Sequence, residues 1–234
     1  MTPSSPIARG LLLGARLGLE RLRDRRTAAA LFLALALAVS GAWIEVEAGS
    51  LGAVDRALAG TFRLVIPLLT LALVTRAASP EGIAAGAFPL ARYGLPRFAV
   101  ALGLAAGAAL VAALASAVLA ALTVTFAHSA AAPPLLRDML LSAWIAAVTA
   151  LAYTAWIALG TTFLRGRGGW APVIADFLVG GSTGLLGALL PRAHASSLLG
   201  LAPGPLSLPA PASFAALFVL TALLLLATAA RSGR

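Results

Sequence analysis

The chain has 234 residues, of which 61% are apolar and only 11% are charged, so it lacks the charge content of a soluble domain. Its net charge of +9 does not indicate nucleic-acid binding, because the arginines stand between long apolar blocks, where charges flank membrane spans. The absence of Cys and Lys excludes disulfides, thiolate metal sites and the lysine-containing phosphate loop of nucleotide hydrolases. We therefore expect a membrane protein without catalytic activity, cofactor or metal of its own.

The first 27 residues alternate arginines with leucines and small residues. This pattern is typical of an amphipathic helix that lies on a membrane, with its guanidinium groups on anionic lipid. The alternative is a signal peptide, whose apolar core follows a short basic stretch and leads to a small-residue cleavage site. Here the basic stretch is long and no clear cleavage site follows 28–44, so we favour the amphipathic helix.

Six apolar segments approach the roughly 20 residues that a helix needs to cross a bilayer. The sequence therefore predicts an all-α polytopic membrane protein with six transmembrane helices. Its parts are a cytoplasmic helix (1–27), a six-span transmembrane domain (28–230) and a cytoplasmic tail (231–234). Arg63, within the second segment, is interpreted as a residue whose long side chain reaches back to the interface. The segments are about 28–44, 57–75, 98–126, 139–164, 171–190 and 212–230.

The distribution of arginine predicts the orientation. If the six segments span, 13 of the 17 arginines lie on the side of the two termini and four on the other side. Positive charge marks the cytoplasmic side, so we expect both termini in the cytoplasm and the protein in a bacterial inner membrane. Four prolines interrupt the apolar stretch 196–212, which predicts an external loop with short helices that dip into the membrane surface, or an ordinary loop packed on the bundle.

The loop between the second and third segments carries a helix-start signal. Ser79 is a favourable N-cap, Pro80 suits the first helical position, and Glu81 would lie in the first turn, where the helix dipole favours an anion. The sequence therefore predicts a short helix over 79–88 at the cytoplasmic membrane surface. The alternative is a plain connecting loop.

The layout resembles the permease subunits of the type-2 ABC exporter family. Glu81, Gly86, Pro96 and Arg97 stand where that family has a Glu-containing coupling helix followed by proline and basic residues. The resemblance implies that Glu81, Gly86, Arg92 and Arg97 couple this chain to a separate ATP-hydrolysing ABC subunit. It also implies that two permease chains pair, as a homodimer or with a similar chain, and that the 196–212 stretch forms the family's external re-entrant hairpin.

Three polar residues fall within the fifth segment. Asp176 is either a substrate or proton site, or a carboxylate bonded to neighbouring helices or to Arg165 or Arg167. Ser182 and Thr183 belong to a formal Gly-x-Ser-x-Gly match at 180–184, a motif that needs a strand, a turn and a partner histidine. We interpret these small residues as a close-packing or locally unwound stretch.

Two further patterns carry less information. His128 and His194 are expected as single histidines in external loops, and Gly103 and Gly107 form a small-residue pair that would let the third span contact a neighbour closely. The leading hypothesis is an exporter permease that binds a partner ATPase, a second permease chain and membrane lipid. The alternatives are a gradient-driven transporter or channel that uses Asp176, a non-transporting membrane scaffold, and an intramembrane enzyme.

Overall fold

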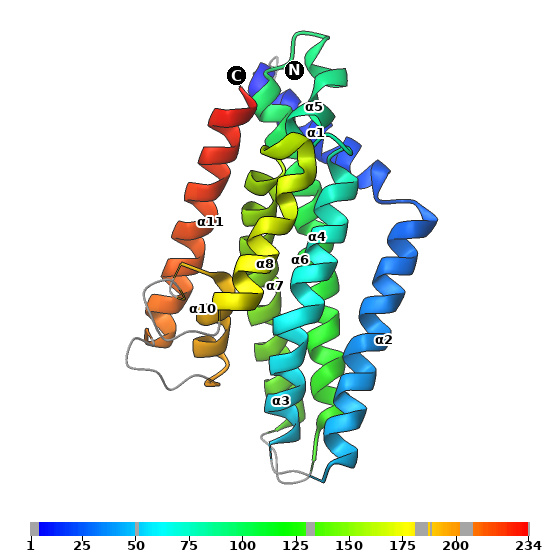
Figure 1. The fold of residues 1–234 in the computed structure, drawn as a ribbon, viewed down its shortest axis with the longest axis vertical. Helices are drawn as coiled ribbons and strands as arrows, with labels where there is room; N and C mark the ends of the chain where they lie inside the picture. The colour runs from blue at the N-terminus through cyan, green and yellow to red at the C-terminus, as the bar shows by residue number, and fades with distance from the viewer. Residues whose placement is uncertain are drawn as a thin grey trace.

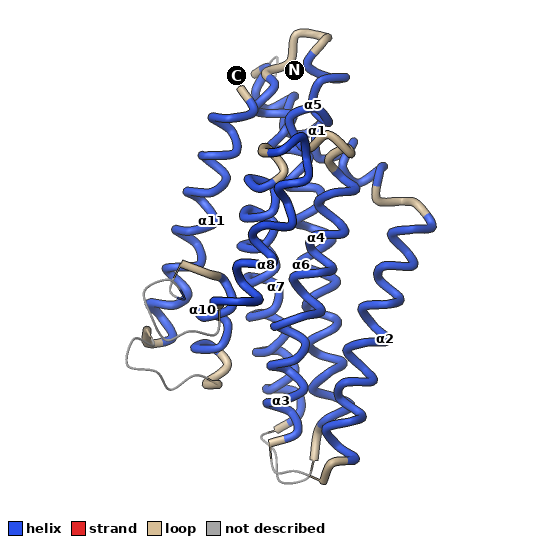
Figure 2. Tube along the Cα trace, in the orientation of Figure 1, coloured by secondary structure: helices blue, strands red, loops and turns tan. Residues whose placement is uncertain are grey.

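The computed structural model describes residues 5–49, 52–129, 134–180, 187, 189–201 and 208–233, and these form a helical bundle without strands (Figures 1 and 2). Five of the helices are long and apolar enough to cross a membrane. The chain is thus a polytopic helical membrane protein. The five are α2 (Arg25–Glu47), the continuous helix Ala53–Ala77 formed by α3 (Ala53–Gly60), η1 (Thr61–Val65) and α4 (Ile66–Ala77), α6 (Arg97–Ala127), α7 (Leu135–Gly160) and α11 (Ala210–Ser232).

These five helices match the first four predicted spans and the last one. The predicted fifth span, 171–190, corresponds only to α8 (Trp170–Val179), whose ten residues are too few to cross a bilayer. Residues 181–186 and 188 lie outside the described part of the chain. The sixth crossing therefore stays a prediction.

Helix α1 (Pro6–Arg21) runs across one end of the bundle, where α5 (Ile83–Ala91) and the C-terminal end of α11 also lie (Figure 1). Ser5 caps α1, with Ala8 N–H donating to its Oγ over 3.2 Å. The chain then turns at Asp24, which caps α2 by accepting from Thr27 N–H at 2.7 Å. Asp24 also pairs with Arg76 at 3.0 Å, and this ion pair joins the start of α2 to the end of α4.

Glycine lets α1 pack tightly on α6. Gly10, Gly14 and Gly18 are the buried residues of α1, and they repeat every four positions on one face. A Cβ on Gly14 would overlap the Val100 carbonyl and lie 3.1 Å from the Cα of Gly103. Such close backbone approach is how helices associate where water does not drive them together. The predicted close contact at Gly103 is confirmed, and the neighbour is α1.

Pro67 widens the second long helix. It has no N–H, and in a regular helix its ring would collide with the carbonyl four residues earlier, that of Arg63. The chain adopts the π-helical turn η1 (Thr61–Val65) at this place, with Ile66 N–H donating to the Thr61 carbonyl five residues back. The turn is held to α6 by the buried pair of hydroxyls on Thr61 and Thr123, 3.2 Å apart.

Helix α10 (Pro191–Leu198) packs against α7 and α11. His194 on this helix is only 3% exposed, so its predicted place in an external loop is wrong. Ala195 beside it is fully buried, which shows that this short helix belongs to the packed bundle. Residues 202–207, in the middle of the proline-rich stretch, lie outside the described residues.

Candidate functional site

Helix α5 begins later than the sequence predicts. Residues 80 and 81 form a turn, and the helix starts at Ile83 with Gly82 as its N-cap. Ser79 does not cap the helix, because its hydroxyl instead donates to the Gly82 carbonyl at 3.0 Å. Glu81 therefore precedes the helix and is exposed on the turn. The predicted N-cap at Ser79 and helix start at Pro80 are each wrong by three residues.

Two glycines explain the late start. Gly82 has φ 101° and ψ 177°, a conformation open almost only to glycine. Its Cα faces the Thr161 carbonyl at the end of α7, so closely that a Cβ there would overlap this oxygen. Gly166, with φ 85°, also lies against this turn, where a Cβ on it would lie 2.6 Å from the Pro80 carbonyl. The 79–82 turn is thus locked between α7 and η2 (Leu164–Gly169).

Arg21, the last residue of α1, holds α5 to the bundle. Its guanidinium donates to the carbonyls of Ala77, at 2.9 Å, and Ala78 at the end of α4, and to that of Gly86 in α5, at 3.3 Å. Partial burial lowers the pKa of Arg21 from its ordinary value, but a guanidinium stays charged at any physiological pH. One charged group therefore bonds to carbonyls of two segments, the end of α4 and α5, that both lie far from α1 in the sequence.

Gly86 makes this arrangement possible. A Cβ at this position would lie 2.8 Å from the Ala78 carbonyl and 3.0 Å from the Arg21 guanidinium, too close for any side chain. The buried backbone of α5 therefore approaches the end of α4 directly. Gly86 was predicted to matter for coupling, and the structure gives it this packing role.

Arg97 holds α5 from a second direction. It is the first residue of α6, and its Nε donates to the Ala84 carbonyl of α5 at 3.3 Å. Arg21 and Arg97 together form what we call the α5 clamp, two arginines from α1 and α6 whose hydrogen bonds to α5 all go to its backbone carbonyls. The clamp brings together Gly86 and Arg97, which the resemblance singled out, and Arg21, which it did not.

The outer face of α5 carries the remaining predicted residue. Arg92 is the C-cap of α5 and is exposed, as is Glu81 on the turn before the helix. Between and beyond them, Phe88 is 55% exposed and Tyr93 is 85% exposed. Two large aromatic side chains, a carboxylate and a guanidinium thus lie on a rigidly mounted element without being needed for its packing. Among these, exposed aromatic and arginine side chains are the kinds enriched in interfaces with other proteins.

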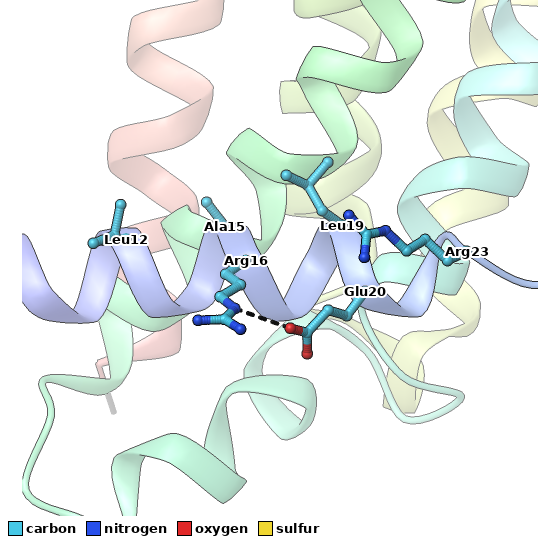
Figure 3. A pocket seen from close by; sticks show the side chains of 6 residues that line it. All are labelled: Leu12, Ala15, Arg16, Leu19, Glu20 and Arg23. Carbon is cyan, nitrogen blue, oxygen red and sulfur yellow. Dashed lines mark hydrogen bonds and ion pairs between the residues drawn. The ribbon is translucent and has the colours of Figure 1, made fainter.

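Helix α1 presents two different sides at this end of the molecule. Figure 3 shows Leu12, Ala15 and Leu19 pointing toward the long helices, while Arg16 and Glu20 point toward α5 and form an ion pair at 3.0 Å. With Arg23 these residues line a hollow of about 290 Å³ along the helix. The apolar side of α1 thus points toward the membrane-spanning helices, and the charged side points away from them.

Arg231 at the end of α11 completes the set of arginines at this end. Its Nε donates to the Thr162 hydroxyl at 3.0 Å, and its guanidinium carbon lies 3.8 Å from the centre of the Phe163 ring. Thr162 and Phe163 follow α7 directly, in the segment that leads to Gly166. The last span is therefore tied to the same loop that locks the turn before α5.

Asp176 lies apart from this site, in α8, and is 1% exposed. Its carboxylate accepts from the Tyr153 hydroxyl of α7 at 2.7 Å and from the Arg192 N–H of α10 at 3.4 Å. The partners are thus neighbouring helices, while no bond to Arg165 or Arg167 forms. Asp176 ties α7, α8 and α10 together. Ser182 and Thr183 lie outside the described residues, so their predicted role stays untested.

Sequence reasoning missed two parts of the site. The spacing of Gly10, Gly14 and Gly18 was a readable signal for a close helix contact, but the surrounding arginines suggested only a membrane surface. Arg21 gave no signal, since it is one of six arginines in the first 27 residues. Only the fold shows that this arginine, and not its neighbours, reaches the end of α4.

We expect Gly82→Ala to loosen the turn before α5. The new Cβ adds backbone strain of about 1–3 kcal/mol and collides with the Thr161 carbonyl, so the loss of stability should exceed strain alone. Gly94→Ala is the matched control, because Gly94 also has positive φ (81°) but has open space around it. Thermal unfolding in detergent measures the stability of both variants. An equal loss of stability in Gly82→Ala and Gly94→Ala would show that the contact with Thr161 does not contribute.

Comparison of the chain with protein-family models, with curated proteins and with solved structures gave no match.

Proposed function

We propose that the chain is the membrane-spanning permease subunit of a bacterial ABC exporter, with α5 as the element that contacts a separate ATP-hydrolysing subunit. The observation that carries the proposal is the mounting of α5. Two arginines and two locked glycines hold its buried side, while Glu81, Phe88 and Tyr93 stay free on the outer side. An element that transmits force between subunits needs such rigid support together with an unoccupied face.

The charge distribution supports the orientation that this function needs. Both described chain ends and α5 lie at the same end of the bundle (Figure 1), and this end carries most of the arginines. Under the positive-inside rule this end is cytoplasmic, where an ATPase would meet α5. Helix α1 would lie along the inner membrane surface, with Leu12 and Leu19 toward lipid and Arg16 toward water.

A permease of this kind works in pairs, and we propose a homodimer or a pair with a similar chain. Large apolar side chains cover the outside of the bundle, so lipid or a second chain can surround the spans without exposing apolar surface to water. The chain itself supplies the path and the coupling element. ATP hydrolysis is assigned to the partner, because the sequence has no lysine for a phosphate-binding loop.

The test is gentle purification of the tagged chain from its native membrane, followed by mass spectrometry of what co-elutes. We expect a stoichiometric ATPase subunit with the natural sequence and a several-fold lower yield of it with the double variant Glu81→Gln and Phe88→Ala. Glu47→Gln is the matched control, because Glu47 is equally exposed but lies at the opposite end of the bundle. Stable purification without any ATPase would contradict the proposal.

A further inference from the structure

Arg63 is a cation at an unusual depth. It lies on the π-turn η1, seven residues beyond Arg56, or about 10 Å further along the helix axis. Arg56 pairs with Glu45 at 2.7 Å, and these two charges mark the end of the bundle opposite to α1. Arg63 therefore lies inside the apolar zone. A charge in that zone is unfavourable without a partner, so Arg63 calls for an anion.

Beside Arg63 the surface is hollowed. A groove of about 210 Å³ runs between the helix η1–α4 and α8, and we call it the Arg63 groove. The Arg63 guanidinium carbon lies 4.9 Å from the centre of the Phe177 ring, a cation–π contact that fixes the side chain at the wall of the groove. All other lining residues are apolar: Leu64, Pro67, Leu68, Trp170, Val173, Ile174, Phe177 and Leu178.

The groove has a polar end and an apolar end. Helix α8 begins near the α1 end of the bundle and runs away from it (Figure 1), so Trp170 at its start lies nearer α1 than Phe177 does. Arg63 contacts Phe177, at the end of the groove farther from α1. From Phe177 back to Trp170 the wall extends for seven residues, or about 10 Å. The positive charge thus faces the nearer membrane surface, and the apolar walls extend from it toward the middle of the membrane. A lipid in the leaflet nearest Arg63 is arranged in the same way, with its headgroup at the membrane surface and its acyl chains toward the middle.

No carboxylate of this protein can neutralise Arg63. Of the eight acidic residues, seven lie in loops, at caps or within four residues of a helix end, and the eighth, Asp176, is buried against Tyr153. Among the described residues Arg63 forms no ion pair. A second copy of the chain would bring the same acids at the same depths. The anion must therefore come from outside the protein.

We propose that the Arg63 groove binds an anionic phospholipid, with the phosphate at the Arg63 guanidinium and an acyl chain along Pro67, Val173 and Ile174. A guanidinium suits this role because it is always charged and offers several donors to phosphate oxygens. The sequence builds the site through Pro67, which causes the π-turn on which Arg63 lies. The site does not depend on transport or on any ATPase.

The experiment uses Trp170, which lines the groove, as the reporter. In a variant with Trp43, Trp144 and Trp156 changed to Phe, Trp170 is the single tryptophan. This chain is placed in nanodiscs of phosphatidylcholine that contain a small fraction of bromine-labelled phosphatidylglycerol or bromine-labelled phosphatidylcholine. We expect about a fivefold preference of the groove for the anionic lipid, seen as stronger quenching, since one interfacial arginine contributes about that factor.

Three substitutions in this background decide the result. Arg63→Gln should remove the preference and Arg63→Lys should keep part of it, while Arg137→Gln, an equal charge change at the same end but outside the groove, should leave it intact. Equal quenching by both lipids in the parent, or an unchanged preference in a folded Arg63→Gln chain, would overturn the proposal. So would efficient disulfide formation between two chains with Leu178→Cys, because a second copy would then cover the groove.

Discussion

Gly14→Ala should separate α1 from α6 and lower the stability of the protein by about 1–3 kcal/mol, the usual cost of overpacking. The reason is that the added methyl group meets backbone, and backbone cannot rotate away. A Cβ on Gly14 overlaps the Val100 carbonyl and lies 3.1 Å from Gly103 Cα, so α1 must move as a whole. Gly103→Ala should have a similar effect, because its Cβ would lie 2.8 Å from the Ala15 nitrogen.

The matched control is Gly41→Ala in α2. Gly41 lies in a helix interior with nothing within 4 Å of the added Cβ, so alanine should be neutral or stabilising by up to about 1 kcal/mol. The thermal midpoint in detergent measures all three variants. A Gly14→Ala protein as stable as Gly41→Ala would show that α1 does not depend on close packing with α6.

Arg21→Gln should release α5. The substitution leaves the carbonyls of Ala77, Ala78 and Gly86 without their charged donor. We expect a loss of at least about 3 kcal/mol, since each such bond contributes roughly 1.5–3 kcal/mol. The sharper readout is local. Trypsin cuts this lysine-free chain only at arginine, and Arg92 at the end of α5 is exposed. Cleavage after Arg92 should become several times faster once α5 is released.

Arg16→Gln is the control for Arg21. It removes the same charge from the same helix, but Arg16 is largely exposed and its side chain pairs only with Glu20, a surface ion pair of small effect. Arg21→Lys should fall between the two, because an ammonium group keeps the charge without the planar fork of donors. If cleavage after Arg92 is as slow in Arg21→Gln as in Arg16→Gln, then Arg21 does not hold α5.

The long helices were predictable because a helix that crosses a bilayer needs about 20 mostly apolar residues, and such runs are visible in the sequence. The third segment was expected over 98–126 and is found as Arg97–Ala127, since nothing interrupts its run of apolar residues. The fourth was expected to reach 164, but it ends at Gly160, because Gly168 and Gly169 pack closely against that residue. Such a contact depends on the fold and has no local signature.

The candidate site shows the same limit. The position of a short helix after the second span was readable from the sequence, but its start was not. Ser79 and Pro80 favour a helix, yet the contact of Gly82 with Thr161, almost 80 residues away, decides where it begins. Arg97 was predicted as part of the site, and its bond to Ala84 is consistent with that, whereas its partner Arg21 depends on how α1 crosses the bundle.

The α5 clamp has a consequence for how this protein can change over time. The hydrogen bonds of Arg21 and Arg97 to α5 all go to its main-chain oxygens, and every residue type supplies such an oxygen. Apart from Gly86 and the buried Ile83 and Ala87, the helix can therefore vary its side chains without loosening its attachment. Exposed residues such as Phe88 and Tyr93 are then open to substitution that changes the chemistry of this surface but not how α5 is held. The attachment of α5 and the chemistry of its exposed face can therefore evolve separately.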